Sequence, residues 1–234
     1  MIALHYDAQT PDAVKLIVAL RVADQEFVTV PVDTGAYAQW EAPHRALAPQ
    51  GQVPVLVDGD LAMPEAAFAL QYIGEAHAPA LVPADPWLWY DLQALNQQID
   101  GAIGPAVNLL GWTRETNVEE RDAHRARLAA IPHRQKPAGW HAVWADAEAN
   151  EDQLANAREK IEGGLAQVAA RLEGADWLVG RAFSLADINA FALIRAARVV
   201  MPQSVTAHPA LAAWLGRVEA RAGALGAVAF AAPA

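Results

Sequence analysis

The sequence predicts an α/β domain at its N-terminus followed by an all-α domain, and three observations support this fold class. In residues 1–78, short β-like segments alternate with helical ones. Residues 79–86 contain three prolines and have the composition of a linker. Beyond it, the periodic segments have helical spacing. We therefore expect a first domain of residues 1–78, a linker of residues 79–86 and a helical domain of residues 87–234.

The first domain is expected to hold a small mixed sheet, with elements in the order β-α-β-α-β-β-α. Its strand-like segments are apolar or β-branched and are bounded by turn residues. Asp58-Gly59 is a two-residue hairpin signal between the last two of them. The predicted strands are residues 2–6, 27–30, 55–57 and 60–63, and the predicted helices include residues 12–23 and a segment introduced by Pro64.

In the helical domain, Ser184-Leu185-Ala186-Asp187 has the S-x-x-D spacing of a capping box at a helix start. Because this cap explains Ser184 and no G-x-S-x-G motif is present, we expect Ser184 and Asp187 to be structural rather than catalytic. The predicted helices include residues 148–172, 185–200 and 208–221.

The composition of the chain excludes several classes of partner and cofactor. The 234 residues are 54% hydrophobic with a net charge of −10, which disfavours nucleic acid and anionic membrane surfaces as partners. There is no apolar run of about 18 residues and no secretory signal, so we expect a cytoplasmic protein. With no cysteine and no close pair among seven histidines, no metal site is expected.

Two motifs resemble those of one known family. Residues 51–60, Gly-Gln-Val-Pro-Val-Leu-Val-Asp-Gly-Asp, with Glu65 after them, resemble the glutathione-binding signature of cytosolic glutathione S-transferases. Residues 177–180, Trp-Leu-Val-Gly, with the capping box at 184–187, resemble the folding motif of that family's helical domain. The resemblance implies a thioredoxin-like first domain, an all-α substrate-binding domain, glutathione as cosubstrate, no metal, and a homodimer or a heterodimer with a related subunit.

The resemblance also implies a glutathione site. Val53-Pro54 matches the family's cis-proline, whose preceding backbone pairs with the cysteinyl backbone of glutathione. Gln52 matches a position that reaches the peptide, and Glu65 matches the residue that takes the γ-glutamyl ammonium. The family's next residue is a serine, whereas this chain has Ala66, which keeps the backbone N–H but loses a hydroxyl.

The position that would activate the thiol is less well defined. Thr10-Pro11-Asp12 resembles the Thr-Pro-Asn turn of several bacterial branches, so Thr10 is the first candidate donor to sulfur. Tyr6 is the second, with packing under a helix as its structural alternative, and the absence of any effective donor is the third. The same resemblance implies that Asp12 borders glutathione, where its carboxylate would raise the thiol pKa; the alternative is that Asp12 serves only as a helix N-cap.

Tryptophans of the helical domain are candidates for the pocket of the second substrate, because aromatic walls suit a flat aromatic electrophile. The alternative is a core or dimer-interface position. A stretch from Ile131 through Trp144 looks like an insertion of bacterial transferases that cleave β-aryl ethers in lignin-derived aromatics. The candidates are Trp112, Trp140 and Trp144, with Trp87, Trp89 and Tyr90 as a further cluster.

The sequence thus predicts a glutathione transferase in which the glutathione thiolate attacks an aromatic-bearing electrophile, with β-aryl ether cleavage as a candidate reaction. The rival hypothesis is a non-catalytic or weakly catalytic subunit, because Asp12, Ala13 and Ala66 stand where helpful polar groups are expected. A glutathione-dependent reductase is a third hypothesis, disfavoured because no cysteine can form a mixed disulfide.

Overall fold

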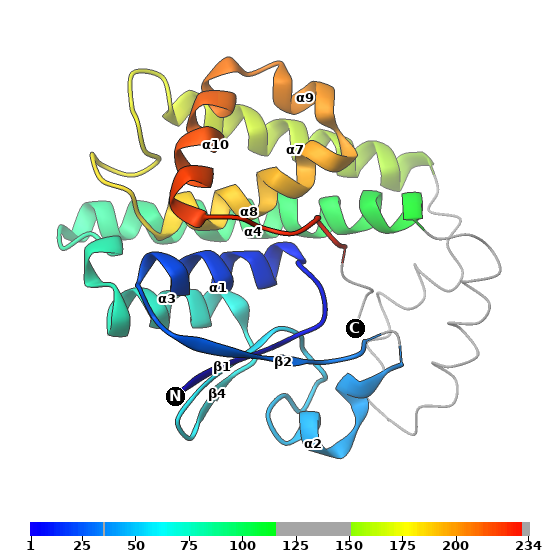
Figure 1. Ribbon diagram of the computed structural model, residues 1–234. Coiled ribbons are helices and arrows are strands. Elements are labelled where there is room, and N and C mark those ends of the chain that lie inside the picture. The colour runs from blue at the N-terminus through cyan, green and yellow to red at the C-terminus, as the bar shows by residue number, and fades with distance from the viewer. Residues whose placement is uncertain (35, 116–150, 231–234) are drawn as a thin grey trace.

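A four-stranded mixed sheet forms the base of the N-terminal domain. The computed structural model describes residues 1–34, 36–115 and 151–230 (Figure 1). Strand β1 (Ile2–Tyr6) is central, parallel to β2 (Phe27–Pro31) and antiparallel to β3 (Val55–Asp58), which pairs with β4 (Leu61–Met63). The order β2-β1-β3-β4 confirms the predicted mixed sheet, including the hairpin at Asp58 and Gly59.

Two helices of this domain pack side by side over the sheet. Helix α1 (Pro11–Val22) begins with Pro11 in its first turn, and α3 (Ala66–His77) follows β4 directly. Figure 1 shows both helices between the sheet and the helical domain. The short elements η1 (Ala38–Trp40) and α2 (Ala42–Arg45) lie between β2 and β3, and η2 (Pro79–Leu81) follows α3.

The C-terminal domain is helical, as predicted. Long helix α4 (Pro86–Glu115) packs against α7 (Glu151–Arg171) and α8 (Leu185–Val200), and α9 (Pro202–Thr206) and α10 (Pro209–Ala222) follow. Residues 223–230 then form an extended tail. No helix among the described ranges is long and apolar enough to cross a membrane.

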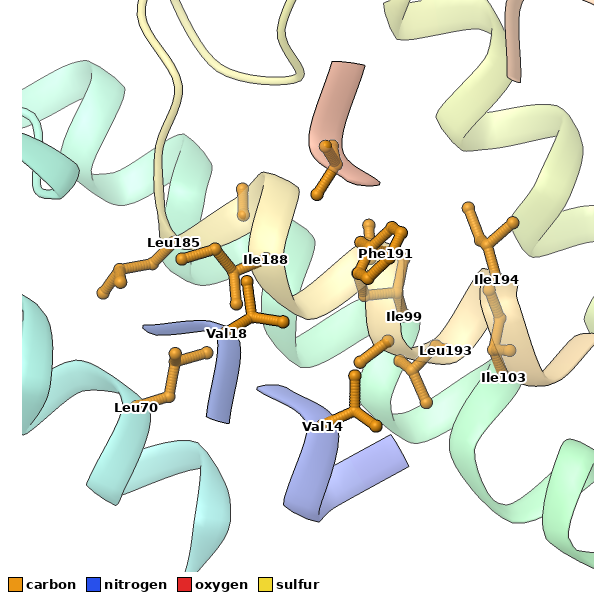
Figure 2. Packing of buried hydrophobic residues seen from close by; sticks show 14 of the residues in the cluster. Val14, Val18, Leu70, Ile99, Ile103, Leu185, Ile188, Phe191, Leu193 and Ile194 are labelled. Carbon is orange, nitrogen blue, oxygen red and sulfur yellow. The ribbon is translucent and has the colours of Figure 1, made fainter. Parts of the chain in front are cut away.

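Helix α8 is the centre of the core and is buried along most of its length. Figure 2 shows Val18 of α1 beside Ile188 of α8, and Val14, one turn earlier in α1, beside Leu193. Helix α1 is therefore buried on two sides, by its own sheet and by the helical domain. This explains why its apolar residues surround it rather than forming a stripe.

The start of α8 is fixed by a buried carboxylate. Oδ2 of Asp187 accepts hydrogen bonds from the backbone N–H and the hydroxyl of Ser184, at 3.0 and 3.1 Å. Its Oδ1 accepts from the N–H of Leu178 at 3.1 Å and from Nε1 of Trp214 at 2.9 Å. The capping box predicted from the sequence is thus present, and it also ties α8 to α10.

Candidate functional site

Sheet register brings three chain segments to one edge of the N-terminal domain. His5, near the end of β1, pairs with Val55 at the start of β3, so the turn before β3 lies beside the loop that leads into α1. Met63, at the end of β4, pairs with Leu56 and brings the start of α3 to the same edge. Residues 7–10, 51–54 and 64–66 therefore surround one position.

The first of these segments ends at Thr10, the N-cap of α1. Its Oγ1 accepts a hydrogen bond from the N–H of Ala13 at 3.3 Å. A hydroxyl that accepts through a lone pair still has its hydrogen to donate. Thr10 is half-buried at a helix N-terminus, where the partial positive charge of the helix favours an anion.

The second segment is the turn at residues 51–54. Gly51 has a φ of +73°, and the Trp40 ring lies 3.3 Å from where a Cβ would stand, so glycine is required here. The Val53–Pro54 peptide bond is cis, as the family motif predicted. Among the described residues, the Val53 backbone makes no hydrogen bond, which leaves its N–H and C=O for a ligand.

A buried histidine supports this turn. Nε2 of His44, in α2, donates to the backbone oxygen of Gln52 at 2.8 Å. The pKa of nearby His5 is lowered, first by burial and then by the charge of His44. The predicted element order includes a helix between β2 and β3, where α2 lies, but sequence analysis did not identify His44, because a single histidine between prolines gives no periodic signal.

The third segment is the start of α3. Glu65 is the N-cap residue, but its side chain does not cap the helix. Instead Oε1 of Glu65 accepts a hydrogen bond from Nε2 of Gln52 at 3.0 Å, which joins the two predicted glutathione-binding residues. The carboxylate is exposed, and the N–H groups of the first turn, including that of Ala66, receive no side-chain cap.

Asp12 and a buried lysine form an ion pair beside Thr10. Oδ1 of Asp12 lies 3.0 Å from Nζ of Lys15, and the same nitrogen lies 3.0 Å from Oδ1 of Asp100 in α4. Burial alone would lower the pKa of Lys15, but the charges of the two carboxylates outweigh it and raise that pKa. Sequence analysis missed Lys15, although a lysine between apolar residues in the middle of α1 was a visible signal.

The structure describes the remaining predicted residues only in part. Tyr6 ends β1, directly before the segment at residues 7–10, and its half-buried ring packs against the hydrophobic core. The side chain of Trp112 and all of Trp140 and Trp144 lie outside the described residues. Trp87, Trp89 and Tyr90 are exposed in the first turn of α4, on the opposite side of the molecule from the start of α1 (Figure 1). This position does not suit a wall of the site.

No cluster of three potential metal ligands occurs in the described part of the chain. The site offers the exposed carboxylate of Glu65, two helix N-termini, the Val53 backbone without hydrogen bonds to described residues, and the hydroxyl of Thr10. Such a set can bind an extended peptide that has a free ammonium and a carboxylate.

Both halves of the chain match family models. The glutathione S-transferase N-terminal domain matches residues 4–81, and the glutathione S-transferase C-terminal domain matches residues 118–222. A glutathione S-transferase of Silene vulgaris is 33% identical over 152 residues, which cover 56% of this chain and 67% of that protein.

Relatives also match over nearly the whole length. Protein LigF of Sphingobium sp. is 25% identical over 229 residues, covering 90% of this chain and 86% of that protein. The crystal structure of beta-etherase LigF from strain SYK-6 aligns with a TM-score of 0.76 at 23% identity, covering 94% and 95% of the two chains. A glutathione S-transferase of Methylobacterium radiotolerans in complex with glutathione sulfonate aligns with a TM-score of 0.69 at 27% identity, covering 94% and 91%.

Proposed function

This chain belongs to the glutathione S-transferase family, and we propose that it binds glutathione at residues 10, 52–54 and 65–66 and transfers it to an aromatic electrophile. The family uses glutathione as its cosubstrate. The observation that carries the proposal is the convergence of the cis-Pro54 turn, the Gln52–Glu65 pair and the start of α1 at one edge of the sheet.

Each part of glutathione has a chemical counterpart at this edge. The backbone N–H and C=O of Val53 pair with the cysteinyl residue as an added strand. The carboxylate of Glu65 binds the α-ammonium of the γ-glutamyl residue, while the N–H of Ala66 at the start of α3 binds its α-carboxylate. The hydrogen bond of 3.0 Å from Gln52 to Glu65 supports this pairing, because it restricts the orientation of the carboxylate.

The sulfur then lies at the N-terminus of α1. A glutathione thiol is mostly protonated at neutral pH, so it must be converted to the thiolate to react. The hydroxyl of Thr10 donates a hydrogen bond to the sulfur, and the helix N-terminus adds a favourable partial charge. Together they stabilise the thiolate, and the thiol proton leaves to solvent.

Replacing Thr10 with valine tests this assignment, because it removes the hydroxyl and keeps the shape. We expect glutathione binding, measured by calorimetry at neutral pH, to persist, while turnover of an aryl halide falls roughly 10- to 100-fold. Thr29→Val, on the exposed face of β2, is the matched control and leaves both unchanged. If Thr10→Val keeps the activity of the parent, the hydroxyl that activates the thiol belongs to Tyr6 or is absent. If the parent does not bind glutathione, the proposal is refuted.

For the electrophile, we propose an aryl ether of the kind found in lignin-derived aromatics. The likeness to LigF over most of both chains supports this substrate class. The thiolate forms a carbon–sulfur bond at the carbon that carries the aryloxy group, and the carbon–oxygen bond breaks. The electron pair leaves with the oxygen, and the phenolate takes up a proton.

The test is to incubate a two-ring β-aryl ether with glutathione and the protein and to quantify products by chromatography. Equal amounts of a glutathionyl thioether and a free phenol are expected. Turnover of an aryl halide without ether cleavage would keep the transferase proposal and refute the ether substrate.

We also propose that the protein is a dimer in the cytoplasm. Large aromatic side chains are exposed on α3 and in the first turn of α4, and a hydrogen bond of 2.7 Å between Gln93 and Gln71 joins those helices. The exposed aromatics are Phe68, Trp87, Trp89 and Tyr90. Burying them between two copies would remove apolar area from water. Light scattering should give twice the mass of one chain for the parent. The double variant Phe68→Glu, Trp87→Glu should have the mass of a single chain. Val28→Glu, on the edge strand β2, is the control and should remain a dimer.

The rival function is that of a non-catalytic subunit. Ala66 favours it, because a binding hydroxyl is missing at the start of α3. An inert parent that gains activity as Ala66→Ser with Asp12→Asn would support the rival hypothesis. An active parent that changes modestly would exclude it.

A further inference from the structure

Lys15 is a charged residue in an apolar setting. Its neighbours in α1, Val14 and Leu16, are core residues, and its own side chain is 2% exposed. Burying an ammonium without partners is strongly unfavourable. Lys15 therefore needs the two carboxylates that lie 3.0 Å from its nitrogen, and the three charges must be considered as one unit.

The two carboxylates come from opposite sides of the domain boundary. Asp12 lies one turn before Lys15, in the turn of α1 that Thr10 caps, and about half of its side chain is exposed. Asp100 lies on α4 in the helical domain. In the part of the chain that the structure describes, these are the ionised groups bonded to Lys15.

We propose that Lys15 is a positioning residue for the transfer reaction: it offsets the negative charge of Asp12 beside the reacting sulfur and holds the capped turn of α1 against the helical domain. The inference rests on the proposed function, because it takes the sulfur to lie at Thr10. Without Lys15, Asp12 would repel a thiolate at that position. With it, the carboxylate is kept in place and largely compensated.

Charge counting predicts a pattern of signs among variants. The parent cluster of Asp12, Lys15 and Asp100 has a net charge of −1. Lys15→Met makes it −2 and should raise the pKa of the bound thiol, whereas Asp12→Asn makes it neutral and should lower that pKa. The double variant returns to −1, so its bound-thiol pKa should lie near that of the parent.

The experiment measures the pKa of glutathione bound to each variant, by ultraviolet absorbance of the thiolate and by the pH profile of kcat/KM for an aryl halide. We expect a rise of roughly one unit in Lys15→Met and a fall of similar size in Asp12→Asn. Lys160→Met removes an exposed lysine from α7 and is the control without a shift. A role in folding alone would not reverse sign between the single variants or cancel in the double one.

Calorimetry with glutathione precedes these titrations and separates the two proposals. If the parent fails to bind glutathione, the proposed function is wrong; if it binds and the thiol pKa is the same in all variants, the role of Lys15 is wrong. Should Lys15→Met not fold, Asp12→Asn and Asp100→Asn decide the question with the ammonium retained. Each should lower the pKa of the bound thiol, and two unshifted values would overturn the inference.

Discussion

Ala66 is the residue at which the proposed glutathione site is least complete. It is the first residue of α3, directly after Glu65, and its backbone N–H points out of an uncapped helix start. Replacing Ala66 with serine adds a hydroxyl that can donate to the γ-glutamyl carboxylate. One such hydrogen bond contributes about 1 kcal/mol, so we expect glutathione to bind about fivefold more tightly by calorimetry.

Ala67→Ser is the control for this substitution. Ala67 is the next residue of α3 and is exposed, so the same hydroxyl is added to the same helix without facing the site. Its affinity should equal that of the parent. An equal gain in both variants would mean that serine acts through the helix and not through the ligand.

Asp187 shows how much of the helical domain depends on a single side chain. Its carboxylate accepts four hydrogen bonds from Ser184, Leu178 and Trp214, and burial raises its pKa even though those bonds lower it in part. Asp187→Ala would leave buried donors without partners, and we expect a loss of about 3–5 kcal/mol in the free energy of unfolding. Urea titration measures this loss. Glu173→Ala, which removes an exposed carboxylate from the same domain, is the control. A loss no larger than that of the control would show that water replaces the lost carboxylate.

At the scale of elements, the tail after α10 is tied to the candidate site. Arg21 donates from Nη1 to the backbone oxygens of Ala222 and Ala224, at 3.0 and 2.8 Å. Further on, the N–H of Ala229 donates to the oxygen of Gln9 at 3.2 Å, next to Thr10, and Phe230 is buried. The tail therefore supports the loop that leads into α1 from outside.

Two glycines of α4 test the importance of this tail. A Cβ on Gly111 would stand 2.2 Å from the Phe230 ring, so Gly111→Ala must displace Phe230. We expect a loss of roughly 1–3 kcal/mol in unfolding free energy, faster proteolysis of the tail and slower turnover. Gly101→Ala is the control, since nothing lies within 4 Å of its Cβ, and it should be neutral or slightly stabilising. Equal behaviour of the two variants would mean that Phe230 moves aside at no cost.

Local patterns predicted the regular elements well. The strand at residues 2–6 and the helix at residues 185–200 have the predicted bounds. Helix α1 differs from its prediction by one residue at each end. Alternation, helical spacing and capping residues are local, so one sequence is enough to read them. The motif at residues 51–54 also predicted the cis peptide bond.

Contacts between distant segments could not be predicted in this way. Lys15 pairs with Asp100 and Gly111 faces Phe230 only because α1, α4 and the tail meet in the folded chain. Nothing local marks such pairs. The roles assigned to Thr10, Glu65 and the tryptophans remain predictions, and Trp140 and Trp144 lie outside the described residues.

At the scale of the whole molecule, α1 makes the two domains depend on each other. It belongs to the sheet domain, yet Val14 and Val18 pack against α8 (Figure 2) and Lys15 pairs with Asp100 of α4. If either domain unfolded alone, this apolar surface and a buried charge would be exposed. We therefore expect one cooperative unfolding transition, coincident by tryptophan fluorescence and far-ultraviolet circular dichroism.

Adding glutathione gives a stricter test of cooperative unfolding. It is proposed to contact only the sheet domain and the start of α1, but in a cooperative molecule it stabilises every element equally. At a hundredfold excess over its Kd, the free energy of unfolding should rise by about 2.7 kcal/mol for both probes. Two transitions, of which glutathione shifts only one, would show that α1 couples the domains too weakly to unite them. In that case the ion pair between Lys15 and Asp100 would connect two independently folding units.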